Sequence, residues 1–349
     1  MKQTTLYPEH KALKAKLVDF NGWEMPIYYK GIIEEHHAVR ESAGIFDVSH
    51  MGVIDISGPH ALEFVQILTV NDASALKINQ SQYTMIADTE GKIMDDMIVT
   101  RLADCFRFVV NCSNFEKIHS WMLINKKEND FKVTIEVKDE LNIIALQGPK
   151  AKEIMTKLAK EELVMSSFYV TAGKLLDSQV LISHTGYTGE DGYEIFVNDK
   201  DVVKLWRGLL EAGAAPIGLG ARDTLRIEAG LPLYGHEIIT GISPYDLGYG
   251  WIVKLNKPKF IGKNVIENLP QKRRLYGLVL KEKTIPRQGV EVKGYGTVTS
   301  GTFSPTLNKS IALFITDKEV VKGDTVFVKI RDKEIEGEVT KLPFIKKGC

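Results

Sequence analysis

Several features are missing from this sequence, and each absence excludes a class of function or of partner. It carries no excess charge, because 45 basic and 45 acidic side chains balance over 349 residues. A chain without a net positive field attracts polyanions weakly, so we expect no nucleic-acid partner. It also lacks any run of about 18 consecutive apolar residues, so we expect no membrane-spanning helix and no membrane partner.

Cysteine is scarce as well. The three cysteines are Cys105, Cys112 and Cys349, an odd number without the CxxC spacing of zinc or redox sites. This usage is typical of a reducing compartment. The first eight residues contain neither the apolar segment of a secretory signal nor the arginine-rich pattern of an organelle presequence. We therefore expect a cytoplasmic location.

Short motifs of metal and nucleotide sites are absent too. The eight histidines form no HxxxH or HExxH pair, so we expect no metal centre. His50 and His236 lie in distinctive segments, and each could be either a functional residue or a satisfied buried histidine. The run Gly218–Arg222 lacks the third glycine and the preceding strand of a dinucleotide site.

The patterns that are present indicate two domains of mixed secondary structure. A chain of this length exceeds the size that one hydrophobic core usually serves. Residues 53–68 and 142–158 share one pattern, a strand that ends at Gly-Pro and leads into an amphipathic helix. This repetition predicts an α+β domain over residues 1–270, built from duplicated strand-helix units.

The composition changes after Leu269-Pro270. Beyond this point, short alternating stretches separated by Gly and Asp turns predict a small C-terminal β-barrel domain over residues 271–349. In the first domain the periodicity also predicts helices over 115–124, 201–212 and 223–230 and strands over 81–87, 97–102, 107–111, 166–170 and 180–183.

The most informative motif is the run Gly186-Tyr187-Thr188-Gly189-Glu190-Asp191-Gly192-Tyr193-Glu194. Its three glycines let the backbone turn tightly and approach a flat ligand. Its tyrosines and glutamates supply ring faces and carboxylates, which suit a planar, amide-rich heterocycle. A second run, Gly218-Leu219-Gly220-Ala221-Arg222-Asp223, adds an arginine.

Together with Asp19–Pro26, Phe46–Gly52, Asp95-Asp96 and Ser300–Leu307, both runs resemble the glycine cleavage T-protein family, the tetrahydrofolate-dependent aminomethyltransferases. The six motifs follow the family's order over nearly the whole chain. The resemblance implies an enzyme that moves a one-carbon unit from the aminomethyl-dihydrolipoyl arm of H protein to tetrahydrofolate. Ammonia is released and 5,10-methylenetetrahydrofolate forms, so the implied co-substrate is tetrahydrofolate and the implied partner is lipoylated H protein.

The resemblance also implies a set of site residues. Asp96, and not Asp95, matches the acid that contacts the reactive nitrogen of tetrahydrofolate. Glu194 and Arg222 match folate-binding residues; a carboxylate can accept two hydrogen bonds from a pterin edge, and a guanidinium suits its carbonyl. The secondary candidates for binding are Met51, Tyr83, Asn111 and Tyr187.

Each candidate also has a plain structural interpretation. An Asp-Asp pair after Glu90-Gly91 could cap a hairpin turn, and on a strand only one of two neighbouring acids can face a pocket. Glu194 and Arg222 could form an ion pair with each other. The two tyrosines and the methionine could be core or turn residues, and the asparagine could bind backbone.

Two other functions stay open at this point. A related folate-dependent demethylase of a small methylated amine or sulfur compound would share Glu194 and Arg222 but would not bind a lipoyl protein. A non-enzymatic folate-binding relative that assists iron-sulfur cluster assembly would keep the fold with degraded motifs, and the intact motifs disfavour it. The basic runs Lys272-Arg273-Arg274 and Lys346-Lys347 are candidates for contact with an acidic H protein.

Overall fold

The computed structural model describes residues 1–159, 164–239, 241–270 and 273–346. The chain divides into two compact units, and each is built from segments that are distant in sequence. The first unit comprises Met1–Thr84, Asp96–Gly186 and Glu190–Arg222, and the second comprises Met85–Asp95, Tyr187–Gly189 and Asp223–Cys349. The domain boundary predicted at residue 270 adjoins residues 271 and 272, which lie outside the described residues, and it stays a prediction.

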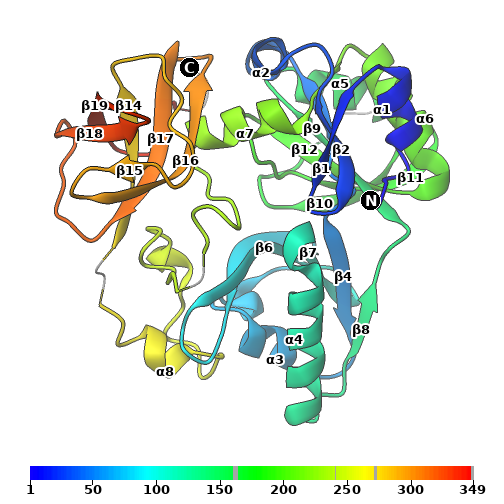
Figure 1. Ribbon diagram of the computed structural model, residues 1–349. Helices are drawn as coiled ribbons and strands as arrows, with labels where there is room; N and C mark the ends of the chain where they lie inside the picture. The colour runs from blue at the N-terminus through cyan, green and yellow to red at the C-terminus, as the bar shows by residue number, and fades with distance from the viewer. Residues whose placement is uncertain (160–163, 240, 271–272, 347–349) are drawn as a thin grey trace. The chain divides into compact units, whose positions relative to one another are not determined.

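A six-stranded sheet forms one half of the first unit (Figure 1). Its order is β10 (Val170–Leu175), β11 (Ser178–Ser183), β12 (Gly192–Asn198), β9 (Leu141–Gln147), β3 (Gly44–Asp47) and β13 (Ala215–Pro216). The helices α5 (Ala151–Ala159) and α6 (Asp199–Glu211) pack on this sheet. Their apolar positions fall at helical spacing, so they bury one face around the fully enclosed Trp206.

A second sheet has five strands. Its order is β5 (Gln80–Ala87), β6 (Ile93–Arg101), β7 (Cys105–Val110), β4 (Gly52–Ser57) and β8 (Thr134–Val137). The helix α3 (Ala61–Leu68) packs against β4 and β7. The remaining elements of the first unit are α1 (Tyr7–Ala12), the hairpin β1 (Lys16–Phe20) and β2 (Trp23–Tyr28), α2 (Ile32–Glu41) and α4 (Phe115–Glu128).

The two repeated segments occupy matching places in the two sheets. One runs from β4 through Gly58 into α3, and the other runs from β9 through Gly148 into α5. Both glycines have a positive φ, 109° and 128°, which a residue with a side chain rarely adopts. The pattern of strand, Gly-Pro turn and helix read from the sequence is therefore present twice in the fold.

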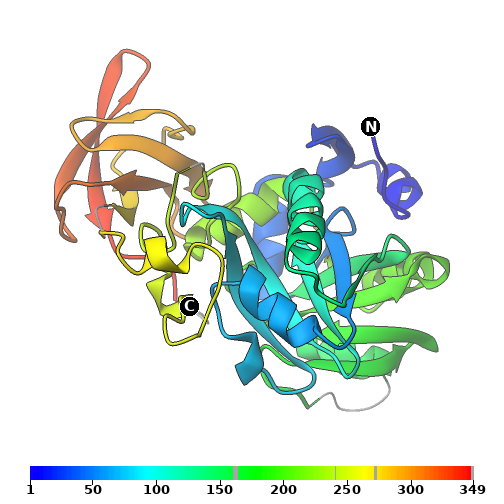
Figure 2. The ribbon, with the colours of Figure 1, turned by 90° about the horizontal axis from the view of Figure 1, so that it is seen from below.

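The second unit contains a closed β-barrel, coloured orange to red in Figures 1 and 2. Its order is β14 (Arg274–Leu280), β17 (Lys309–Thr316), β16 (Gly296–Ser304), β15 (Glu291–Val292), β18 (Thr325–Ile330) and β19 (Lys333–Thr340). Buried side chains such as Leu278, Phe314 and Val328 fill its interior. The short helix α8 (Lys263–Ile266) precedes the barrel. The predicted fold class, α+β with a C-terminal barrel, is confirmed.

Three predicted elements are misplaced. The strand predicted over 97–102 begins four residues earlier, at Ile93, and forms β6. The strand predicted over 166–170 begins at Val170 instead and forms β10. The helix predicted over 223–230 is α7 (Leu219–Glu228), which begins four residues earlier because Gly220 is helical. A Cβ atom at Gly220 would lie 2.6 Å from the side chain of Ile32, so close packing requires a glycine inside this helix.

Candidate functional site

The structure brings three of the predicted site residues together on adjacent strands of the five-stranded sheet. Asp96 lies on β6, Tyr83 on β5, and Asn111 directly after β7. The Tyr83 hydroxyl donates a hydrogen bond to Asp96 Oδ2 at 2.9 Å, and Asn111 Nδ2 donates one to Oδ1 at 3.1 Å. Asn111 Nδ2 also lies 3.2 Å from the backbone carbonyl of Asp96. Both oxygens of the carboxyl group are therefore held in a fixed orientation.

Burial changes the proton affinity of this carboxyl group. It raises the pKa of Asp96 from 3.8 to about 6, although the hydrogen bonds from Tyr83 and Asn111 act in the opposite direction. A carboxyl group with this pKa can take up and release a proton near neutral pH, as a general acid or base requires. Its neighbour Asp95 is fully buried and belongs to the second unit.

The turn before β6 has its own acid. Asp88 Oδ1 accepts hydrogen bonds from the backbone N–H groups of Glu90, at 2.9 Å, and Lys92, at 3.0 Å. Because β6 begins at Ile93, Asp95 and Asp96 both lie inside the strand. The alternative in which these two acids cap the hairpin is wrong, since Asp88 occupies that place.

Glu194 lies on β12 of the six-stranded sheet. Its Oε2 accepts a hydrogen bond of 2.5 Å from the Thr185 hydroxyl, which in turn lies 2.8 Å from Ser183 Oγ. A Cβ atom at Gly186 would lie 2.0 Å from Gln147 Oε1, so this turn needs glycine to clear a neighbouring side chain. Thr185 fixes the rotamer of the carboxylate, and sequence reasoning did not single it out.

Two other residues of the glycine-rich run Gly186–Glu194 make contacts that stabilise the fold. Glu190 pairs with Arg40 at 2.8 Å, and both side chains are less than one tenth exposed. Tyr193 is 2% exposed and stacks on His184 with ring centroids 5.0 Å apart. The interpretation of these two residues as a ligand carboxylate and a stacking face is therefore corrected, because their side chains are committed to interior contacts.

Tyr187 belongs to the second unit. Its hydroxyl donates a hydrogen bond to the backbone carbonyl of Pro232. The contact fixes the ring from its polar end, and it ties the glycine-rich run to the segment that follows α7.

Arg222 lies in the first turn of α7, and a buried carboxylate fixes the start of that helix. Glu35 is 2% exposed, and its Oε2 accepts a hydrogen bond of 2.8 Å from the backbone N–H of Gly218. Its Oε1 accepts three further backbone hydrogen bonds, from Tyr29, Lys30 and Gly31. Glu35 therefore helps to place Arg222, and no motif in the sequence pointed to it.

Met51 follows His50 in the sequence, and burial together with the charge of Arg222 lowers the pKa of His50. His50 is 5% exposed, and burial lowers its pKa to about 4; the Asp47 carboxylate opposes this shift and the Arg222 guanidinium adds to it. The imidazole is therefore neutral at physiological pH. His50 is buried, but its Nδ1 has no hydrogen-bond partner among the described residues, so it is not the satisfied buried histidine of the second alternative.

The basic runs are only partly described, because Lys272 and Lys347 lie outside the described residues. Arg273 Nη2 is bound to the Gly241 carbonyl at 2.6 Å and to Asp246 at 3.2 Å, whereas Arg274 and Lys346 are exposed. Over the described ranges, no group of three His, Cys, Asp or Glu side chains is placed to hold a metal ion. No helix there is both long and apolar enough to cross a membrane.

Comparisons with known proteins agree over the whole chain. Residues 6–257 match the family model of the GCVT N-terminal domain, and residues 273–346 match that of the glycine cleavage T-protein C-terminal barrel domain. An aminomethyltransferase of Alkaliphilus metalliredigens is 44% identical, with 99% of this chain and 98% of the relative covered. One from Halothermothrix orenii is 43% identical, with 99% of this chain and 100% of the relative covered.

A solved structure extends the agreement to the fold. The glycine cleavage system aminomethyltransferase T of Bartonella henselae is 32% identical and superposes with a TM-score of 0.92, covering 99% of this chain and 98% of that one. Two family models in the expected order, relatives above 40% identity and a full-length structural match lead to one assignment. The chain belongs to the glycine cleavage T-protein family.

Proposed function

We propose that this chain is an aminomethyltransferase of the glycine cleavage system. It transfers the one-carbon unit from the aminomethyl-dihydrolipoyl arm of H protein to tetrahydrofolate, releases ammonia and forms 5,10-methylenetetrahydrofolate. The family assignment supports this reaction, and the observation that carries the catalytic role is the partly buried carboxyl group of Asp96, held between Tyr83 and Asn111.

The donors and acceptors of the first unit suit a folate. The carboxylate of Glu194 is preset by Thr185 and matches adjacent N–H donors of a pterin, while the guanidinium of Arg222 matches a carbonyl. Met51 would add an adaptable apolar side chain for contact with the flat ring system. When bound, tetrahydrofolate supplies the amine nitrogens that receive the one-carbon unit.

Asp96 acts on the proton of the reacting amine. Because Tyr83 and Asn111 bind both of its oxygens, the carboxyl group is oriented before substrate arrives, and little reorganisation is needed during the reaction. Its ionised form can accept a proton and can stabilise a nearby cationic carbon-nitrogen centre. Burial raises its pKa to about 6, so the carboxylate is a stronger base than an exposed aspartate and is still mostly ionised at neutral pH.

The direct test is incubation of the purified chain with aminomethylated H protein and tetrahydrofolate, with ammonia as the product measured. Ammonia release that requires both substrates is the expected result. Absence of release with H protein, combined with demethylation of a small methylated amine in the presence of tetrahydrofolate, would assign the chain to the related demethylases instead.

A further inference from the structure

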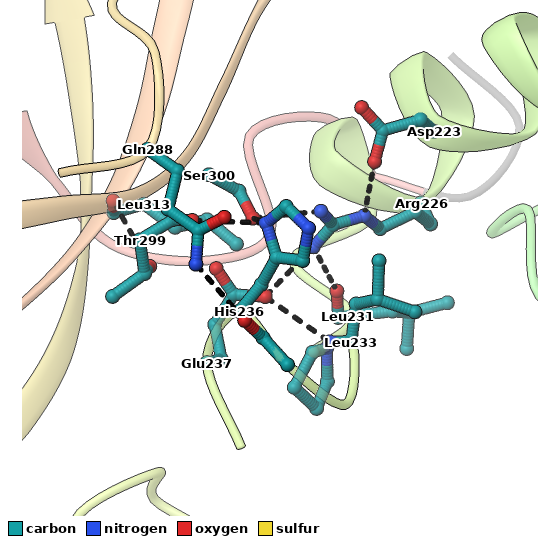
Figure 3. A network of polar contacts seen from close by, with 12 residues as sticks. Asp223, Arg226, Leu231, Leu233, His236, Glu237, Gln288, Thr299, Ser300 and Leu313 are labelled. Carbon is teal, nitrogen blue, oxygen red and sulfur yellow. Dashed lines mark hydrogen bonds and ion pairs between the residues drawn. The ribbon is translucent and has the colours of Figure 1, made fainter. Parts of the chain in front are cut away.

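A buried arginine one turn after Arg222 organises the end of α7 (Figure 3). Arg226 is 1% exposed, and its guanidinium donates to four acceptors. These are Asp223 Oδ1 at 2.8 Å, the Leu231 carbonyl at 3.2 Å, Glu237 Oε2 at 2.8 Å and Ser300 Oγ at 2.7 Å. A planar guanidinium with several fixed partners holds them in one geometry.

Two of the four acceptors, Leu231 and Glu237, lie at the two ends of one loop, residues 231–237. Glu237 is fully buried, and the same Oε2 that binds Arg226 also accepts the backbone N–H of Leu233 at 3.1 Å. His236 Nδ1 lies 3.2 Å from Ser300 Oγ, so the loop is also tied to β16. Figure 3 shows the side chains converging on the guanidinium. The conformation of the loop therefore depends on this ion pair.

The first part of that loop binds Tyr187. The carbonyl that accepts the Tyr187 hydroxyl belongs to Pro232, which lies between Leu231 and Leu233, and both neighbours are bound within the ion-pair network. The charge on Arg226 also responds to its surroundings. Burial would lower its pKa, but Glu237, Tyr187 and Asp223 together raise it, so the guanidinium stays charged.

We propose that Arg226 and Glu237 are positioning residues for the folate site, because their ion pair fixes the Pro232 carbonyl and thereby the ring of Tyr187. This inference rests on the proposed function and on Tyr187 as a folate contact. It also gives a role to Ser300, which begins the Ser300–Leu307 motif: its hydroxyl completes the network around Arg226 and need not touch a ligand.

The same helix provides a matched control. Glu228 is also fully buried, and it binds Ser304 and Thr306 of the same motif, but these contacts do not lead to the loop 231–237. Replacing either glutamate by glutamine keeps the side-chain volume and removes one buried charge. Both variants should lose stability, whereas only Glu237→Gln should affect Tyr187.

The experiment is a double-mutant cycle on the dissociation constant for tetrahydrofolate, measured by titration calorimetry. We expect Tyr187→Phe and Glu237→Gln each to weaken binding about fivefold, a loss on the scale of one hydrogen bond. The double variant should also show about a fivefold loss, because the loop acts only through the hydroxyl that Tyr187→Phe has removed. The control Glu228→Gln should leave the dissociation constant unchanged in both backgrounds.

Other results would overturn the inference. Unchanged folate affinity in Glu237→Gln with a lowered melting temperature would make the pair purely structural, and losses that multiply to about 25-fold would show that it does not act through Tyr187. If Glu237→Gln does not fold, Ser300→Ala removes one neutral partner of Arg226 and should weaken binding about twofold, only when Tyr187 is present. An unchanged affinity in Ser300→Ala would count against the proposal.

The wild-type chain separates this inference from the proposed function. If the wild-type protein binds no tetrahydrofolate and releases no ammonia from aminomethylated H protein, the proposed function fails. If it does both while the cycle shows independent effects, only the positioning role fails.

Discussion

Replacing Asp96 by asparagine separates its chemistry from its place in the fold. The carboxamide has the shape of the carboxyl group, and both hydrogen bonds survive: its oxygen accepts from Asn111, and its amide donates to the Tyr83 oxygen, which can accept as well as donate. The substitution removes the negative charge and the exchangeable proton. We therefore expect an intact fold and a damaged reaction.

The expected change in stability follows from the pKa of Asp96. In the folded chain burial raises the pKa of Asp96 from 3.8 to about 6, so ionising it costs the folded state up to about 3 kcal/mol, at 1.36 kcal/mol per pH unit. This cost is absent below pH 3.8, grows between 3.8 and about 6, and is complete above about 6. At pH 7.5 the Asp96→Asn variant should therefore be as stable as the wild type or more stable, by up to about 3 kcal/mol.

The reaction should change in the opposite direction. Loss of a positioned general base typically lowers a rate by about 100-fold to 10,000-fold, so kcat for ammonia release should fall at least about 100-fold. Folate affinity should stay within a few-fold. The matched control is Asp88→Asn in the adjoining turn, which should leave kcat unchanged. A kcat for Asp96→Asn within about twofold of the wild-type value would refute the catalytic role.

Four further predictions follow from the same geometry. The wild-type kcat should rise with pH through an inflection near 6 as Asp96 ionises, and the asparagine variant should lack that limb of the pH profile. Glu194→Ala and Arg222→Ala should each weaken folate binding by about 2 kcal/mol in calorimetry; unchanged affinity with a lower melting temperature would instead indicate a mutual ion pair. Glu35→Gln should lower the free energy of unfolding by about 1–3 kcal/mol in urea titrations, because four backbone amides lose a charged acceptor. Arg274→Glu should raise the Michaelis constant for H protein and flatten its salt dependence without changing folate affinity, and rates insensitive to both the reversal and salt would remove this face from the interface.

Elements with a strong local pattern could be predicted from the sequence. The amphipathic helix expected at the end of residues 53–68 is α3, because its apolar positions recur at helical spacing. The prediction for the edge strand β10 was wrong, because Val170–Leu175 contains a glycine and two exposed side chains and so lacks a clear strand pattern. Pairing with β11 makes this segment a strand. Its neighbours in space, and not its own composition, decide its conformation.

The candidate site shows the same division between local and distant information. Asp96 could be placed on a strand from the apolar residues around it, and the family resemblance distinguished it from Asp95. Glu35 could not be found in this way, because the amide that it binds at Gly218 lies 183 residues away. Thr185 was missed for a related reason, since its role depends on how the turn after β11 folds back on β12.

A motif that identifies a family mixes residues that bind ligand with residues that hold the fold. In Ser300–Leu307 the hydroxyls of Ser300, Ser304 and Thr306 all bind the buried charges of α7. Buried charges are costly unless they are fully hydrogen-bonded, so such hydroxyls are as necessary to the fold as a core side chain. The resemblance gives these residues and Arg222 equal weight. Only the geometry distinguishes them, because the hydroxyls of Ser300, Ser304 and Thr306 bind residues inside the second unit.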